Sequence, residues 1–139
     1  MLDTRVLFRI VVWLGVIANW SFGLWVLFGD GNNLLAMLRL GRQDSMLWLY
    51  NYSILLMILS LFYIPAARDP FRYRANAWLL VVGRLVPATT FLLGVALGYM
   101  PNGFLTLFIA DGAFGLIELF LLLQIFRDGP RPRDYGYRQ

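Results

Sequence analysis

The sequence predicts an all-α integral membrane protein, a bundle of four transmembrane helices. Three observations lead to this fold class. Of the 139 residues, 60% are hydrophobic and only 14% are charged, which is too apolar for a soluble domain of this size. Four apolar runs are each long enough to cross a bilayer at about 1.5 Å per helical residue. The basic residues are concentrated in the segments on one side of these runs.

The first apolar run extends from about Val6 to Phe28, and Asp3 is a candidate cap for its helix. We interpret this run as a transmembrane helix because a cleaved signal peptide has a shorter apolar core and a small-residue cleavage site. Residues 29–33 are rich in glycine and asparagine and interrupt the helix. Residues 34–40 then have the pattern of a short amphipathic turn on the membrane surface.

The second apolar run covers residues 46–64 and is predicted to end at Pro65. A basic connector follows, in which Asp69 can cap the third helix and Pro70 can take its first position. The start of the second run carries aromatic residues that are typical of a membrane interface. These are Trp48, Tyr50 and Tyr52.

The third and fourth apolar runs are joined by a minimal turn and are expected to be antiparallel neighbours. The third covers residues 77–99 and contains Pro87, which removes a backbone hydrogen bond and predicts a kink. Gly94 and Gly98 form a Gly-x-x-x-Gly step, which predicts close packing against another helix. The fourth run extends from Phe104 to Phe126.

The chain is therefore divided into a transmembrane domain, residues 1–126, and a cytoplasmic tail, residues 127–139. The tail has two prolines and no apolar periodicity, so it is expected to be extended. Near a membrane surface each arginine contributes about 1 kcal/mol of attraction to anionic lipid. The tail arginines predicted to contact lipid or a partner are Arg127, Arg131, Arg133 and Arg138.

The arginine distribution predicts the orientation. The N-terminal segment, the second connector and the tail together hold nine arginines, whereas the first connector holds two and the last turn none. Positively charged segments stay on the cytoplasmic side. Both termini are therefore expected in the cytoplasm.

Three ionisable residues lie inside the apolar runs, where each one needs a partner or a function. Arg84 lies eight residues past Asn76, and Glu118 lies eight residues before Phe126, so both are at a depth of roughly 12 Å. This predicts an intramembrane Arg84–Glu118 ion pair. Asp111 lies about 10 Å further out, which we expect to be too far for Arg84 to reach while it also serves Glu118.

Asp111 has other polar residues at nearly its own height in the remaining runs. We expect them to form an intramembrane polar cluster that hydrogen-bonds its carboxyl group. These residues are Asn19, Asn51, Thr89 and Thr90. Three interpretations stay open: internal polar contacts that fix helix register, a proton or ion step or ligand pocket between helices, and a surface that docks another membrane protein.

Composition excludes several kinds of chemistry. The chain has no cysteine and no histidine, so it has no disulfide, no thiolate nucleophile, no Cys/His metal site and no histidine-held haem. It also lacks a phosphate-binding loop, a dinucleotide fingerprint and a serine with a plausible base. We therefore expect neither enzymatic activity nor a cofactor or metal, and nucleic-acid binding is not expected of four spans with one short basic tail.

Residues 63–74, followed by Arg84 in the third helix and Asp111 in the fourth, carry a resemblance to a known group. In these positions the chain resembles small four-helix bacterial membrane proteins of the DoxX-like kind. The resemblance implies a multi-pass protein of the bacterial cytoplasmic (inner) membrane. It also implies an accessory role beside redox enzymes that feed the quinone pool, with a quinone or lipid as a candidate ligand near the bundle.

Two functions from different classes follow. The first is a non-catalytic accessory or assembly subunit of a larger membrane complex, such as an electron-transfer or photosynthetic one, with other integral membrane subunits as partners. The second is a small transporter or carrier that uses Asp111, Glu118 and Arg84 along a polar path. Four spans enclose little volume, so such a carrier is expected to work as an oligomer.

Overall fold

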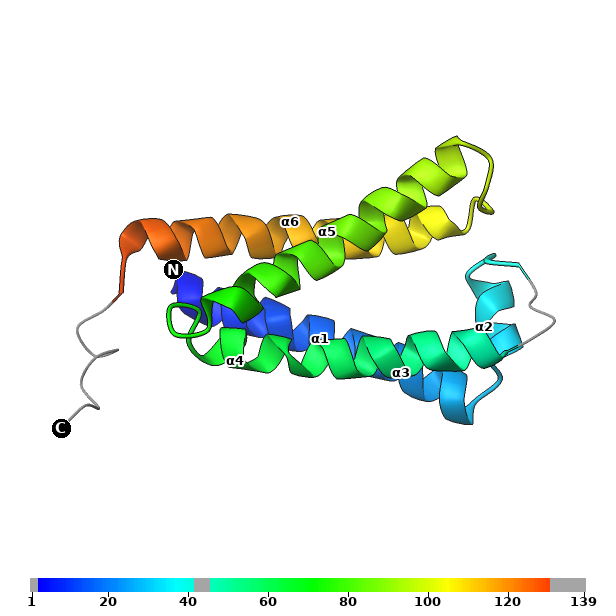
Figure 1. The fold of residues 1–139 in the computed structure, drawn as a ribbon, viewed down its shortest axis with the longest axis horizontal. Helices are drawn as coiled ribbons and strands as arrows, with labels where there is room; N and C mark the ends of the chain where they lie inside the picture. The colour runs from blue at the N-terminus through cyan, green and yellow to red at the C-terminus, as the bar shows by residue number, and fades with distance from the viewer. Residues whose placement is uncertain (1–2, 42–45, 131–139) are drawn as a thin grey trace.

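The computed structural model describes residues 3–41 and 46–130, and all of the secondary structure in them is helical (Figure 1). The helices are α1 (Thr4–Phe28), α2 (Gly31–Met37), α3 (Leu47–Leu61), α4 (Tyr63–Arg68), α5 (Arg74–Ala96) and α6 (Phe104–Asp128). Four helical segments are long and apolar enough to cross a membrane, namely α1, α3 together with α4, α5, and α6. This confirms the predicted all-α architecture with four candidate spans.

The first connector, for which a short amphipathic turn was predicted, contains the short helix α2, and the apolar side of this helix packs on protein. Asp30 accepts a hydrogen bond from the backbone N–H of Asn33 at 3.0 Å and caps α2. Leu34 and Leu35 are buried in a cluster with Val26 of α1 and Leu49 of α3. These leucines close one end of the bundle, and the location of this connector on the membrane surface stays a prediction.

The second span continues past Pro65. The chain turns at Phe62 and resumes as α4, in whose first turn Pro65 lies. Proline is tolerated there because the first backbone N–H groups of a helix have no partner within the helix. The prediction that Pro65 ends the span is therefore wrong. Asp69 does cap, but it accepts bonds from the N–H groups of Phe71 and Arg72 in a separate turn, and α5 begins only at Arg74.

Gly94 and Gly98 do not form a helix-packing step. Helix α5 ends at Ala96, and Gly98 lies beyond it with φ of 75° and no atom within 4 Å of a built Cβ. The N–H of Tyr99 donates to the carbonyl of Gly94 at 2.8 Å, and the N–H of Gly98 donates to that of Val95 at 3.0 Å. This pair of bonds is a Schellman motif, which needs a residue in the left-handed region. Gly98 thus ends the helix, and the packing prediction is wrong.

The two ends of the described chain lie at the same end of the bundle, together with the connector from α4 to α5 (Figure 1). Arg5 Nη2 donates to the carbonyl of Gly129 at 2.7 Å, and Arg9 Nε donates to the carbonyl of Ala67 at 3.2 Å. An even number of spans requires this arrangement. Which side of the membrane this end faces stays a prediction from the arginine distribution.

The buried core has two parts. In the half nearest the termini, α1, α4, α5 and α6 pack together around large side chains such as Phe8, Tyr63 and Leu122. Towards the other end, α5 leans away from α3 (Figure 1), and the second cluster lies between α1, α2 and α3. Pro87 lies inside α5, and a kink at this position stays a prediction.

Candidate functional site

Arg84 of α5 is the centre of a buried polar cluster formed with α1 and α6. The residue is only 4% exposed. Its Nη1 donates to Asp111 Oδ1 at 2.7 Å and to Asn19 Oδ1 at 3.3 Å. The expectation that Asp111 is beyond the reach of Arg84 is therefore wrong.

Glu118 lies on the other side of the same guanidinium group. The distance from Arg84 Nε to Glu118 Oε2 is 4.0 Å, so the predicted ion pair is present but is longer than a hydrogen bond. Glu118 is 0% exposed, and neither of its oxygens has a hydrogen-bond partner among the described residues. Asp111 and Glu118 are seven residues apart and share one face of α6. Arg84 lies between them and donates a hydrogen bond to Asp111.

Two glycines leave space for the Arg84 side chain, Gly15 at the guanidinium group and Gly115 at its base. A Cβ on Gly15 of α1 would collide with Arg84 Nη2. A Cβ on Gly115 of α6 would lie 2.7 Å from Leu85 Cδ2 and 3.0 Å from Arg84 Cβ. Sequence reasoning did not assign Gly15, although Gly115 could be found from its place between Asp111 and Glu118 on one helix face.

An aromatic ring adds to the environment of the cation. The Arg84 Cζ lies 5.1 Å from the centroid of the Phe114 ring. This is within the range of a cation–π contact. Two of the nitrogens, Nε and Nη2, are buried and have no hydrogen-bond partner in the described part of the chain. The cation is therefore held by one short ion pair, one longer ion pair, the hydrogen bond to Asn19 and one ring.

The rest of the predicted polar cluster does not join this site. Of the four residues, only Asn19 contacts Arg84. Asn51 is exposed, and so are Thr89 and Thr90. The threonine hydroxyls donate to carbonyls of their own helix, Thr89 to Leu85 at 2.8 Å and Thr90 to Val86 at 2.9 Å. Equal depth did not bring these side chains together, because they lie on other faces of their helices.

A cleft of about 240 Å³ between α3, α4 and α5 leads to the cluster. Asp111 lines it and has a side chain that is 25% exposed, whereas the Glu118 side chain is sealed. The walls are mostly apolar, with two tyrosines. The lining residues are Asn19, Tyr52, Leu55, Leu56, Leu59, Tyr63, Gly83, Arg84, Pro87 and Asp111. Tyr52, predicted only as an interfacial anchor, thus also faces a polar site.

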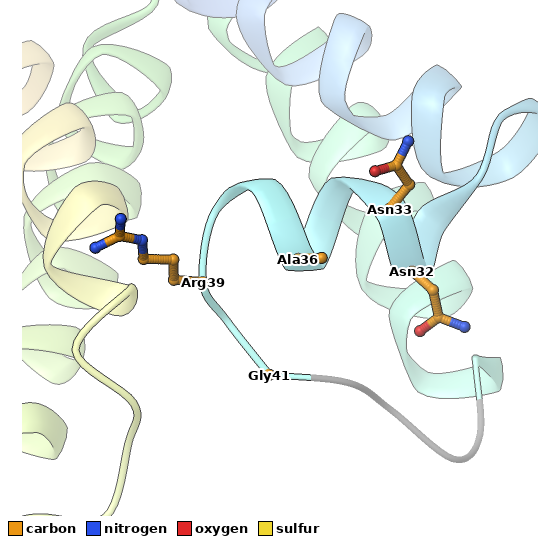
Figure 2. Close-up of a pocket in the computed structure, with 5 residues that line it drawn as sticks. All are labelled: Asn32, Asn33, Ala36, Arg39 and Gly41. Carbon is orange, nitrogen blue, oxygen red and sulfur yellow. The ribbon is translucent and has the colours of Figure 1, made fainter.

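A larger hollow of about 590 Å³ lies at the end of the bundle beside α2 and is lined by Asn32, Asn33, Ala36, Arg39 and Gly41 (Figure 2). In Figure 2 the Arg39 side chain, just past the end of α2, extends towards the start of α6, whereas Asn32 and Asn33 lie at the opposite end of α2. Among the described residues its lining contains no carboxylate, and the hollow lies apart from Arg84. We therefore place the candidate site in the cleft at Asp111.

The charges of the site set its chemistry. Two carboxyl groups share one guanidinium, so the cluster carries a charge of −1 when all three are ionised. An uncompensated charge at membrane depth is costly. The cluster therefore favours one additional positive charge, either a proton or a bound cation. The described residues contain no group of three His, Cys, Asp or Glu side chains that could hold a metal ion.

The tail arginines are only partly described. The Arg127 side chain is 78% exposed, and its Nε lies 3.7 Å from Asp128 Oδ1. Arg131, Arg133 and Arg138 lie outside the described residues. The predicted contact of these four arginines with anionic lipid or a partner stays a prediction.

Comparison of the chain with protein-family models, with curated proteins and with solved structures found no match. The resemblance to DoxX-like proteins therefore stays a prediction. What the observations establish is a multi-pass helical protein with four candidate spans and a buried arginine held between two carboxyl groups.

Proposed function

We propose that the chain is a small, non-enzymatic membrane carrier that binds its ligand at Asp111 in the cleft between α3 and α5. One observation carries this proposal. Arg84 connects a carboxylate that reaches the cleft, Asp111, to a carboxyl group that is sealed from it, Glu118. Internal contacts that only fix helix register need no such opening, whereas a ligand site does.

The proposal includes an oligomer. The cleft has a volume of about 240 Å³ and lies at the side of the bundle. The helices on its two sides, α3 and α5, do not pack mainly on each other. Helix α3 packs mainly on α1, and α5 packs mainly on α6. A second copy beside the cleft would close its open side and enclose Asp111, so a homodimer is the expected working unit.

The accessory-subunit hypothesis is the second candidate, and the same cleft supports it in a different way. A carboxylate that is 25% exposed at membrane depth requires cover. A transmembrane helix of a larger complex could supply this cover. In that case the Arg84 cluster would position the subunit in its complex and would bind no transported ligand.

Native-gel migration with mass spectrometry separates the two candidates. The tagged chain is extracted from its own membranes in a mild detergent. Migration as a small homo-oligomer is expected for the carrier. Co-migration with a large complex at fixed stoichiometry would overturn the carrier proposal and support the accessory subunit.

The variant Asp111→Asn, compared with Asp128→Asn at the exposed end of the same helix, extends this test. If the chain is a carrier, Asp111→Asn is expected to leave the oligomer intact and to abolish transport, whereas Asp128→Asn is expected to change neither. If Asp111→Asn instead releases the chain from a large complex, the cleft is a subunit interface.

A further inference from the structure

The Arg84 cluster has one acidic group more than it has basic groups, and the surplus acid is the sealed one. Asp111 is already satisfied by the 2.7 Å bond from Arg84. Glu118 has no hydrogen-bond partner among the described residues and is 0% exposed. A carboxyl group in this position is best accommodated with a proton on it, because the ionised form would be buried without a bond.

Arg84 has a second position available. Its Nε and Nη2 have no hydrogen-bond partner in the described chain, and its Nε is already 4.0 Å from Glu118. A shift of about 1 Å would convert this distance into a charge-assisted hydrogen bond. This shift moves the guanidinium group along the face of α1 at Gly15, which has no side chain. A Cβ at Gly15 would lie 3.7 Å from Glu118 Oε1, so the space beside this glycine adjoins Glu118.

The cleft suits a cation with an apolar body. Its walls combine Leu55, Leu56 and Leu59 with the rings of Tyr52 and Tyr63, and Asp111 lies at its polar end. Aromatic rings and one carboxylate are the usual recognition elements for organic ammonium ions. An anionic ligand would instead meet two carboxyl groups and a guanidinium that is already shared between them.

We propose that the cleft binds a monovalent organic cation at Asp111 and that binding transfers Arg84 to Glu118, which releases one proton. The step balances: the cation adds one positive charge, the O–H bond of the Glu118 carboxyl group breaks, and its proton leaves to solvent. The net charge of the occupied cluster equals that of the empty one. This inference rests on the proposed carrier function and gives it a substrate class and an exchange ion.

Few other titratable groups face Glu118 in the described structure. Arg84 faces it from α5 and Asp111 from its own helix, and Tyr63 of α4 and Tyr52 of α3 are near the cluster. Helix α1 contributes Asn19 and Gly15, which do not titrate. Glu118 is therefore the fully buried carboxyl group of the cluster that no hydrogen bond from a described residue satisfies.

The test is calorimetric titration of the purified full chain in detergent with benzyltrimethylammonium. Its uncharged isostere, neopentylbenzene, is the control ligand. Titrations in phosphate and in Tris, whose ionisation enthalpies differ, give the number of protons released per bound cation. Wild type is expected to release about one proton, and its affinity is expected to rise about tenfold per pH unit while Glu118 is protonated.

Three variants make the test specific. Asp111→Asn is expected to lose cation binding. Glu118→Gln is expected to bind the cation with no proton release and with an affinity independent of pH. Asp128→Asn, an exposed carboxylate on α6, is expected to match wild type in both.

The outcomes are distinguishable from those of the proposed function. Equal binding of neopentylbenzene, or no binding of the cation by a well-folded homo-oligomer, overturns the cation site and leaves the carrier proposal standing. Unchanged proton release in Glu118→Gln overturns the exchange step and leaves the cation site. Co-migration with a large complex overturns the carrier function itself, whatever the titration shows.

Discussion

Asp111 and Glu118 are two acidic residues on one face of one helix, and their surroundings differ sharply. Asp111 is 25% exposed in its side chain, lines the cleft and accepts a 2.7 Å bond from Arg84. Glu118 is sealed, is 4.0 Å from the same arginine and has no hydrogen bond among the described residues. The difference shows that depth along a helix does not determine which acid a buried arginine bonds. The two acids differ in exposure because the cleft between α3 and α5 reaches Asp111 and does not reach Glu118.

Removal of the shared cation is expected to have the largest effect on this comparison. Arg84→Met leaves two carboxyl groups buried without a basic partner. Loss of one partner of a buried ion pair costs about 3–5 kcal/mol of unfolding free energy. Denaturant unfolding of the purified protein in detergent measures the loss. The double variant Arg84→Met/Asp111→Leu should recover a large part of it, because it also removes the carboxylate that Arg84 bonds, and a double variant no more stable than the single would show that Asp111 is not the main partner of Arg84.

Removal of the two acids one at a time tests the asymmetry directly. Asp111→Leu removes a charge-assisted hydrogen bond and is expected to cost about 1.5–3 kcal/mol. Glu118→Met removes no hydrogen bond, replaces the acid with an apolar side chain of similar length and is expected to cost less than about 1 kcal/mol. The same unfolding assay compares them. Equal losses, or a larger loss for Glu118→Met, would contradict the assignment of Asp111 as the main partner.

The space around Arg84 is tested by Gly115, which has a matched control on the same helix. Gly115→Ala places a Cβ 2.7 Å from Leu85 Cδ2 and is expected to cost about 1–3 kcal/mol by overpacking. Gly112→Ala meets atoms only at 3.8 Å or beyond and is expected to change stability by less than about 0.5 kcal/mol. If both variants have the same free energy of unfolding, the close approach of α5 and α6 at Arg84 does not restrict residue 115 to glycine.

The all-α class and the four candidate spans could be predicted from the sequence, because the length and composition of an apolar run depend on the bilayer and not on neighbouring helices. The sequence also identified Arg84, Asp111 and Glu118, since an ionisable residue in such a run is conspicuous. The cap at Asp3 was predicted for the same local reason, and it accepts the N–H of Arg5 at 3.1 Å.

Which of these groups contact one another could not be predicted in this way, because the contacts depend on how the helices pack. Depth counted along straight, parallel helices placed Asn51, Thr89 and Thr90 beside Asp111, but all three are exposed, and Asn19 alone reaches Arg84. Rotation of each helix about its axis selects the partners, and that rotation is set by packing over the whole bundle. The cleft has the same origin, because it is the space left where α3 packs on α1 and α5 packs on α6.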